Sequence, residues 1–361
     1  MIRPTLHLIG IFHTIHNQEF SHCAFTGKAL RFPEMMQAQG FPVVEYSNQG
    51  SESAAHEKVV MLRAEEFDEL LGNREDTKFH GDTATVGSRH HTLFEQRLIE
   101  EMKRRVQPGD LICHPFGHAH QRVLSEFPKN IHIETGIGYS TTMPSAIHIF
   151  ESYAWRHYHA GKDKRQGNNY EWVIPNYFDV TQWDVSEAPG EYYAFLGRID
   201  ACKGLDTLFE IAKNLPIDGP KIVLCGQGNP DRWQHEMIEY RGPLKGRARS
   251  EFLGKAICSL MPTKFIEPFG GSGVEGMLCG TPLISVDYGA FTETVMCGFT
   301  GYRCRTLQHW MDALPAATHL NRLEIANHAR ATYSLETCGG LYTEAFETIH
   351  GLYGKGWYTL R

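Results

Sequence analysis

Apolar and polar positions along the chain follow a pattern that predicts strands separated by helices. Three apolar runs bounded by turn residues predict buried parallel strands at residues 6–12, 110–116 and 130–136. Between the first two, residues 94–106 carry apolar side chains at helical spacing and end before a Pro-Gly-Asp turn. Strands joined by helices form right-handed crossovers, so the first half is expected to be a doubly wound α/β domain.

The second half shares this architecture without repeating the sequence. Its expected elements are strands at 192–198, 221–228 and 281–287, a helix at 205–215, an apolar segment at 250–260 and a helical tail from about residue 306. Between the halves, residues 176–191 are polar, aperiodic and rich in breakers, which predicts a domain boundary. Ligands of open α/β sheets bind beyond the carboxyl ends of the strands, so the site is expected in those loops.

Composition narrows the class of protein. The chain has 361 residues, 42% of them hydrophobic, which is long enough for two domains. No apolar stretch approaches the about 18 residues of a membrane-spanning helix, and residues 1–16 lack the features of a signal peptide. Nine cysteines without a Cys-x-x-Cys pair predict buried free thiols in a reducing cytosol, and therefore a cytoplasmic protein.

The sharpest motif is the segment from Glu267 to Glu275, which contains three closely spaced glycines. These glycines are Gly270, Gly271 and Gly273. They permit tight backbone conformations with outward amides, and the pattern becomes helical from Val274. Free amides at a helix N-terminus suit a phosphate. The two flanking carboxylates suit hydroxyl groups better, one on a sugar and one on a ribose.

A second motif, Gly197-Arg198-Ile-Asp-Ala-Cys-Lys203-Gly204, follows a predicted strand and precedes a predicted helix. Arg198 and Lys203 can therefore project from one loop. A bidentate guanidinium and a compact ammonium fit a diphosphate leaving group. For either motif alone, a glycine-rich turn with solvated charges is an equal interpretation. Their order and spacing within one domain favour the anion site.

These motifs resemble glycosyltransferase family 4. Glu267 and Glu275 match its Glu-x7-Glu motif, and Arg198 and Lys203 its Gly-Arg…Lys-Gly loop. Three further segments carry the resemblance, which spans roughly residues 173–300: VIPNYFD at 173–179, LCGQG at 224–228 and GTPLISVDYGAFTE at 280–293. The resemblance implies the GT-B fold, with two facing Rossmann-like domains at 1–178 and 179–335 and a C-terminal helix, 336–361, that returns to the first domain.

The resemblance also implies roles for the motif residues. Arg198 and Lys203 would bind the donor diphosphate together with the backbone amides of Phe269, Gly270 and Gly271. Gly197 and Gly226 would belong to the donor-binding loops. Glu275 would hold the ribose, and Glu267 the transferred sugar. The family transfers sugars with retention of anomeric configuration, and GT-B enzymes generally work without a bound metal, so no cofactor is expected.

The first half holds most of the 20 histidines. His114, His118 and His120 have a spacing that suits zinc, but no carboxylate or cysteine nearby in the sequence completes such a site, so no metal is expected. His114 and His118 are instead expected to line the ligand cleft and contact substrate hydroxyls, or to cap the turn. His90 and His91 are expected to be surface or partly buried residues.

Two departures from the family pattern concern the acceptor side. The usual Gly-Gly after the first strand is replaced by Ile9-Gly10-Ile-Phe-His13, so donor contacts from this loop are open, and His13 is a candidate residue on the acceptor side. Where the family often carries a histidine near the sugar, this chain has Glu134, followed by Tyr139. Glu134 could contact the sugar, orient the acceptor hydroxyl, or cap the next helix.

The sequence therefore predicts a retaining glycosyltransferase that moves a hexose or related sugar from a UDP- or GDP-sugar to a hydroxyl of a saccharide, lipid-linked glycan or natural product. A hydroxymethylated base in DNA is a second possible acceptor and the only role foreseen for nucleic acid. The net charge of −7 and the absence of a basic tract longer than Lys103-Arg104-Arg105 argue against it. A nucleotide-sugar epimerase and a non-catalytic nucleotide-sugar-binding protein are also compatible with this architecture.

Overall fold

The computed structural model describes residues 3–20, 23–72, 84–144, 146–167, 170–188 and 190–352. The chain divides into two compact units. The first unit comprises residues 1–151, 164–178 and 335–361, and the second comprises 152–163 and 179–334.

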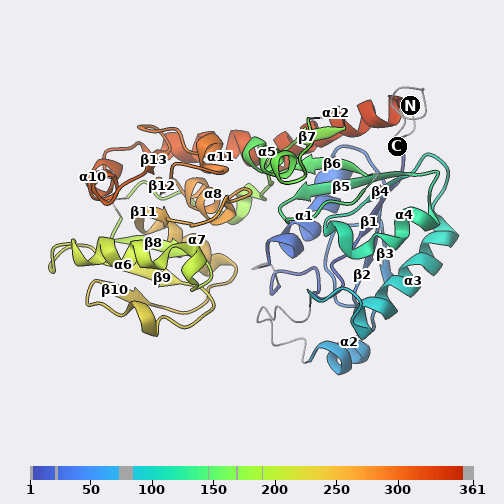
Figure 1. The fold of residues 1–361 in the computed structure, drawn as a ribbon, viewed down its shortest axis with the longest axis horizontal. Coiled ribbons are helices and arrows are strands. Elements are labelled where there is room, and N and C mark those ends of the chain that lie inside the picture. The colour runs from blue at the N-terminus through green and yellow to red at the C-terminus, as the bar shows by residue number, and fades with distance from the viewer. Residues whose placement is uncertain are drawn as a thin grey trace. The chain divides into compact units, whose positions relative to one another are not determined.

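The first unit is built on a seven-stranded parallel sheet of order β3-β2-β1-β4-β5-β6-β7 (Figure 1). Its strands are β1 (Leu6–Ile9), β2 (Val43–Ser47), β3 (Glu57–Val60), β4 (Leu111–Cys113), β5 (Ile131–Ile137), β6 (Ile147–Phe150) and β7 (Glu171–Val173). Its helices are α1 (Ala24–Ala38), α2 (Ala64–Leu71), α3 (Arg89–Arg105), η2 (Gly117–His120), α4 (Arg122–Glu126) and α12 (Leu335–Leu352). The strand order reverses between β1 and β4, as in a doubly wound fold.

Helices cover both faces of this sheet, which explains why its central strands are apolar runs rather than alternating patterns. Side chains on one face, including Leu6 and Leu8, form a core with Phe32 of α1 and Phe346 of α12. Ile9 and Ile112, on the other face, share a core with α2 and α3 residues such as Phe67, Phe94 and Leu98.

Helix α12 packs within the first unit, as the expected returning helix would. Its Gly339 lies inside a continuous helix rather than at a hinge or bend. A Cβ added there would lie 3.1 Å from Cγ of Met35 and 3.2 Å from Cγ of Gln39 in and beside α1. The glycine therefore lets two helices approach closely.

The second unit contains a six-stranded parallel sheet of order β10-β9-β8-β11-β12-β13. Its strands are β8 (Tyr192–Leu196), β9 (Ile222–Cys225), β10 (Ile238–Tyr240), β11 (Ala256–Met261), β12 (Leu283–Val286) and β13 (Gly301–Cys304). Its helices are α5 (Tyr153–Lys162), η3 (Val180–Gln182), η4 (Ala201–Lys203), α6 (Leu205–Lys213), η5 (Asp231–Trp233), α7 (Arg247–Gly254), α8 (Gly271–Leu278), α9 (Phe291–Thr294), α10 (Leu307–Ala317) and α11 (Arg322–Tyr333).

Helix α5 falls within the expected first domain, 1–178, but belongs to the second unit. One reason is local: the Glu293 carboxylate accepts hydrogen bonds from the amides of Tyr153 and Ala154, at 2.9 and 2.7 Å. These are the first two amides of α5, which have no partner inside the helix. A carboxylate is favourable there because it also faces the positive end of the helix dipole.

The doubly wound architecture predicted for both halves is confirmed. Strands and helices are present at the predicted positions, with ends shifted by a few residues. The segment 250–260 is a helix end followed by a strand, since α7 runs into β11. The helical tail consists of three helices, α10, α11 and α12. All nine cysteines are free, and seven of them are buried. None of the described helices is both long enough and apolar enough to cross a bilayer.

Candidate functional site

The glycine-rich motif forms the start of helix α8. Gly270 is its N-cap residue in the left-handed conformation, with φ 85° and ψ 47°. The amides of Gly273 and Val274 both bond to the Gly270 carbonyl, at 3.0 and 3.4 Å. The two leading amides, those of Gly271 and Ser272, precede the first intrahelical bonds and are therefore the ones suited to an anion.

The three glycines of this motif have different roles. Only Gly270 has a positive φ, contrary to the expectation that all three would adopt tight conformations. Gly273 lies inside α8, where a Cβ would come within 2.6 Å of Leu283 and 2.8 Å of Met261. It therefore permits close packing of the helix on β11 and β12, rather than a turn.

The structure brings Lys203 and Glu267 together although they lie far apart in sequence. The Lys203 ammonium donates a hydrogen bond of 2.8 Å to Oε2 of Glu267 and stands 4.6 Å from the centre of the Phe265 ring. The hydroxyl of Thr263 donates to the same carboxylate oxygen at 3.3 Å. Both charged side chains are largely shielded, with exposed fractions of 17% and 12%. The pair therefore holds a cation and a carboxylate at one end of the sheet.

Local geometry explains the position of Lys203. The Asp200 side chain caps η4 by accepting from the amide of Cys202 at 2.8 Å. Bonds from Cys202 hold the pKa of Asp200 below its usual value. Gly204, which follows Lys203, has φ 81°, and a Cβ there would lie 1.9 Å from the carbonyl oxygen of Pro262. The Lys203 loop therefore lies directly against the loop that follows β11. Arg198, the third residue expected to carry the chemistry, is exposed.

Gly197 and Gly226 lie side by side where β8 and β9 end. The Gly197 amide donates to the carbonyl of Cys225 at 3.0 Å. Gly226 has φ 150°, and a Cβ there would lie 1.7 Å from the Gly197 carbonyl oxygen. The Tyr240 hydroxyl donates to the carbonyls of Gly226 and Gly228, at 2.8 and 3.2 Å. This tyrosine thus holds the glycine turn in place.

Gly226→Ala is expected to lower the free energy of unfolding by about 2–3 kcal/mol, because the new methyl group meets a backbone atom in addition to an unfavourable φ. Gly242→Ala is the matched control, since its φ is 79° but no described atom lies within 4 Å of the added Cβ. Urea unfolding followed by circular dichroism measures both variants. Equal losses in the two would show that the contact with Gly197 does not matter.

Glu275, expected to hold a ribose, forms an ion pair with Arg249 from α7. The two side chains are only 14% and 16% exposed, and Nε of Arg249 is buried without a hydrogen-bond partner among the described residues. Sequence reasoning missed Arg249, because it lies 26 residues before Glu275 in a segment without any motif. Its position fixes the carboxylate one turn after the leading amides of α8.

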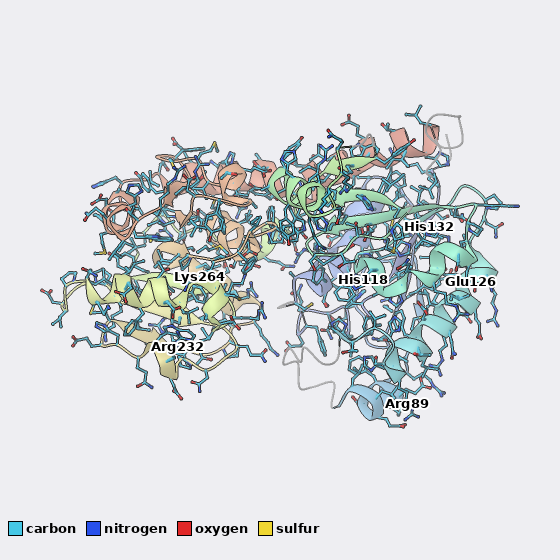
Figure 2. The ribbon with its side chains drawn as sticks, viewed as in Figure 1. Arg89, His118, Glu126, His132, Arg232 and Lys264 are labelled. Atoms are coloured by element: carbon cyan, nitrogen blue, oxygen red, sulfur yellow. The ribbon has the colours of Figure 1, made fainter. Side chains whose placement is uncertain are left out.

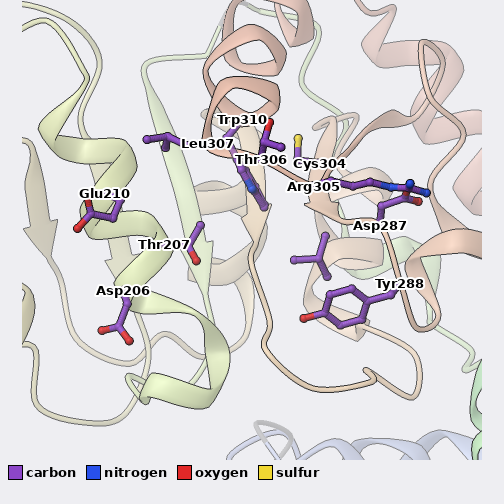
Figure 3. A pocket seen from close by; sticks show the side chains of 11 residues that line it. Asp206, Thr207, Glu210, Asp287, Tyr288, Cys304, Arg305, Thr306, Leu307 and Trp310 are labelled. Carbon is purple, nitrogen blue, oxygen red and sulfur yellow. The ribbon is translucent and has the colours of Figure 1, made fainter.

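The second unit also has a cavity of about 610 Å³ that contains none of the expected donor residues (Figure 3). It is lined by residues of α6, β12, β13 and α10 and of the loops that follow β12 and β13, among them Asp206, Asp287, Arg305 and Trp310. Asp287 is paired with Arg303 and Arg305 at 3.2 and 2.6 Å. Bonds from Lys264 and then Trp233 lower the pKa of Asp206. Asp206 and Asp287 are both already paired with basic side chains. The cavity therefore offers no obvious group for sugar chemistry.

In the first unit, His114 is a core residue. It is 1% exposed, and its Nε2 lies 3.1 Å from Nδ1 of His132, which is labelled in Figure 2. Burial, followed by the nearby charge of His132, holds the pKa of His114 well below its usual value. Burial likewise lowers the pKa of His132. The expected contact between His114 and a substrate hydroxyl therefore has no support in its position.

Glu134 is a fully buried residue of β5 and already has partners. Its carboxylate accepts from the Tyr139 hydroxyl at 2.7 Å and from the Met143 amide at 2.9 Å, and it lies 3.1 Å from Nε2 of His148. Burial is the largest single effect and lowers the pKa of His148, but the hydrogen bond and the charge of Glu134, together with the Met143 carbonyl and Glu171, raise the pKa overall. The bond from its hydroxyl to Glu134 holds Tyr139 in position, which is a different role from the three left open for this glutamate.

Gly117 allows the Glu134–Tyr139 pair to lie against η2. A Cβ at this position would come within 2.3 Å of the Tyr139 hydroxyl and 2.4 Å of the Glu134 carboxylate. Its neighbour His118 is partly exposed and lies edge-on to the Tyr139 ring at 6.2 Å. Of the residues expected on the acceptor side, His118 and Tyr139 therefore lie close together, and both are partly accessible.

The other histidines of the first unit are more buried than expected. His13 is 6% exposed between the rings of Phe12 and Phe116, and burial lowers its pKa to about 4. His90 and His91, expected to be surface or partly buried residues, are only 7% and 4% exposed. They belong to the apolar stripe of α3, whose register along the sheet was not evident from the sequence.

Comparison with known proteins places this geometry in context. Residues 184–313 match the family model described as Glycosyl transferases group 1. Glycogen synthase of Xanthomonas oryzae pv. oryzae (strain PXO99A) is 29% identical over 153 residues, which cover 36% of this chain and 30% of the relative. Glycogen synthase of Mycobacterium tuberculosis (strain ATCC 25618 / H37Rv) is 26% identical over 148 residues, covering 37% and 35%. The chain thus matches about a third of the length of these curated relatives.

Solved structures resemble the whole chain. AviGT4, a glycosyltransferase involved in avilamycin A biosynthesis, superposes with a TM-score of 0.68 at 16% identity and covers 96% of this chain and 98% of its own. Sucrose-phosphate synthase from Thermosynechococcus elongatus has a TM-score of 0.68 at 15% identity, covering 97% and 100%. Anabaena HepE, solved with UDP and glucose, has a TM-score of 0.64 at 12% identity, covering 96% and 100%. The chain therefore has the fold of GT-B glycosyltransferases, and residues 184–313 of its second unit match the glycosyl transferases group 1 model.

Proposed function

We propose that this protein is a retaining glycosyltransferase that transfers a hexose or related sugar from a UDP- or GDP-sugar to an acceptor hydroxyl. The observation that carries the proposal is the Lys203–Glu267 pair beside the Gly270-capped start of α8, within the segment that matches the glycosyl transferases group 1 model. HepE, with a similar fold, was solved with UDP and with UDP-glucose, which supports a nucleotide sugar as donor.

The chemistry follows from the charges at this place. As the bond between the anomeric carbon and the diphosphate oxygen breaks, negative charge grows on the leaving group. Lys203, Arg198 and the leading amides of α8 stabilise that charge, so no metal is needed for this step. The acceptor oxygen forms the new bond to the anomeric carbon and gives up its proton to the departing diphosphate oxygen, and the nucleoside diphosphate leaves. Such fixed, preorganised charges act without reorganisation during the reaction.

The two glutamates bind hydroxyl groups in this proposal. Glu267 accepts a hydrogen bond from the transferred sugar while its ion pair with Lys203 keeps the carboxylate oriented. Glu275 accepts from the ribose, and Arg249 holds it in place. The leading amides of α8 lie between these carboxylates in the sequence, so phosphate, ribose and sugar can be bound along one path. On the acceptor side we propose His118 and Tyr139, with Glu134 orienting the tyrosine.

Ligand-induced stabilisation of the full chain tests the donor proposal. A nucleotide sugar at about 100 times its dissociation constant should stabilise the native state by about 2.7 kcal/mol, which is visible as a higher melting temperature. The screen compares UDP- and GDP-sugars with UMP and GMP, which lack the diphosphate and should stabilise less. Slow release of nucleoside diphosphate and free sugar without acceptor would distinguish an enzyme from a protein that only binds. The proposal fails if no nucleotide sugar raises the melting temperature.

A further inference from the structure

The first unit contains a group of possible metal ligands that the donor chemistry does not use. His91 and Glu95 lie one turn apart on α3, and His120 comes from η2. One ligand atom of each residue lies within 4.8 Å of the others. The i, i+4 spacing places His91 and Glu95 on the same face of the helix. The carboxylate that the His114–His120 segment lacked in sequence is thus supplied by a helix that precedes it.

Among these three residues, His120 has the surroundings that most strongly indicate a metal ligand. It is 2% exposed, and neither Nδ1 nor Nε2 has a hydrogen-bond partner in the part of the chain that the structure describes. Its ring stacks on His91 and on Phe94, both at 5.3 Å, and meets the Phe12 ring edge-on at 5.8 Å. The nearest charge is the Glu95 carboxylate, whose Oε1 lies 3.8 Å from Nδ1 of His120. That distance is too long for a hydrogen bond, but it leaves room for the two imidazole rings and the carboxylate to approach a shared ion.

We propose that His91, Glu95 and His120 form a binding site for a divalent transition-metal ion, with Zn²⁺ as the ion of choice. Two imidazoles and one carboxylate form a ligand set that suits zinc, with water completing the tetrahedron. The ion would tie α3 to η2, the turn that carries His118 and follows β4. Its role in this position is structural, because the rings around it are buried.

Binding requires a change at His91. Its Nδ1 accepts from the Gly87 amide at 3.1 Å, and its Nε2 lies 2.6 Å from the carbonyl oxygen of Ala119. A metal ion would replace one of these two bonds. The Glu95 side chain is 13% exposed, so it can reach the ion and also leave an approach from solvent. The site is therefore reachable without opening the core.

Metal titration of the full-length chain, without a histidine tag and after treatment with a chelator, tests this proposal. Zn²⁺ alone should bind saturably with one ion per chain and raise the melting temperature, and Co²⁺ should give the absorption bands of a tetrahedral site. Glu95→Gln keeps the shape of the side chain but removes its charge. It should weaken Zn²⁺ binding by at least the about 10–100-fold that follows loss of an outer-shell partner.

Two controls and one further variant keep the test decisive. Glu100→Gln changes an exposed glutamate of the same helix, and His157→Ala an exposed histidine elsewhere. Both should bind Zn²⁺ as the unchanged chain does. His120→Phe replaces the ring by one that fits its aromatic neighbours, so it should fold but lose the Zn²⁺-dependent rise in melting temperature. Absence of saturable binding to the unchanged chain, or equal affinity of Glu95→Gln and Glu100→Gln, would overturn the proposal.

Discussion

Lys203→Ala and Arg198→Ala are each expected to lower the turnover of sugar transfer by about 10²–10³-fold, the scale observed when one preorganised charge-stabilising group is removed. Both cations are proposed to face the departing diphosphate, so their loss is felt mainly in the transition state. The expected signature is a lower kcat with a smaller change in KM. Release of nucleoside diphosphate, measured with a coupled assay once a donor has been identified, gives both constants.

The two variants differ in what they leave behind. Arg198 is exposed, whereas removal of Lys203 leaves the shielded Glu267 carboxylate without its ion-pair partner. Lys203→Ala is therefore expected to lose some stability as well. The double variant that combines Lys203→Ala with Glu267→Gln should recover this stability but not the turnover. Lys213→Ala is the matched control, because this lysine pairs with Glu210 on the exposed side of α6. Near-normal turnover in both Arg198→Ala and Lys203→Ala would refute the assignment of the diphosphate site.

Arg322→Met is expected to cost the largest amount of stability, about 3–5 kcal/mol, because it leaves several buried carbonyl groups without a donor. The guanidinium donates to the carbonyls of Ser186, Gly254 and Ala256 at 2.6–2.8 Å and to the Thr281 hydroxyl at 2.9 Å. Burial lowers the pKa of this arginine. Methionine keeps most of the apolar stem, so the loss reports the hydrogen bonds rather than packing.

Arg247→Met serves as the control for this prediction. Arg247 pairs with Asp184 at 3.1 Å, but both side chains are mostly exposed. Such surface pairs contribute about 0–1 kcal/mol, so its unfolding midpoint in urea should barely move. If Arg322→Met were no less stable than Arg247→Met, the four bonds of Arg322 would not contribute to holding α7, β11 and β12 together.

The proposed metal site and the proposed donor site are independent of one another. The former depends only on residues of the first unit, and the latter only on residues of the second. Zinc binding could therefore be found in a chain whose donor is still unknown, and a nucleotide sugar could stabilise a chain that binds no metal. Each experiment decides one proposal without reference to the other.

The sequence by itself determined the architecture and the local parts of the proposed donor site. Apolar runs and helical periods identify doubly wound domains, because parallel strands buried on both faces cannot alternate. The Gly270 turn and the Arg198–Lys203 loop are also readable, since their chemistry lies within a few consecutive residues. Edge strands such as β3 and β10, which are short and partly exposed, carry too few apolar residues to be recognised.

Only the tertiary structure decided which distant side chains meet. Lys203 and Glu267 are 64 residues apart, and the bond between them depends on β8 and β11 being neighbours in the sheet. Likewise, His120 meets His91 and Glu95 because α3 packs beside η2, and no spacing within either segment predicts that contact. Whether a histidine is a ligand, a core ring or a surface group depends on the register of its element against the sheet, which the order of residues along one element does not specify.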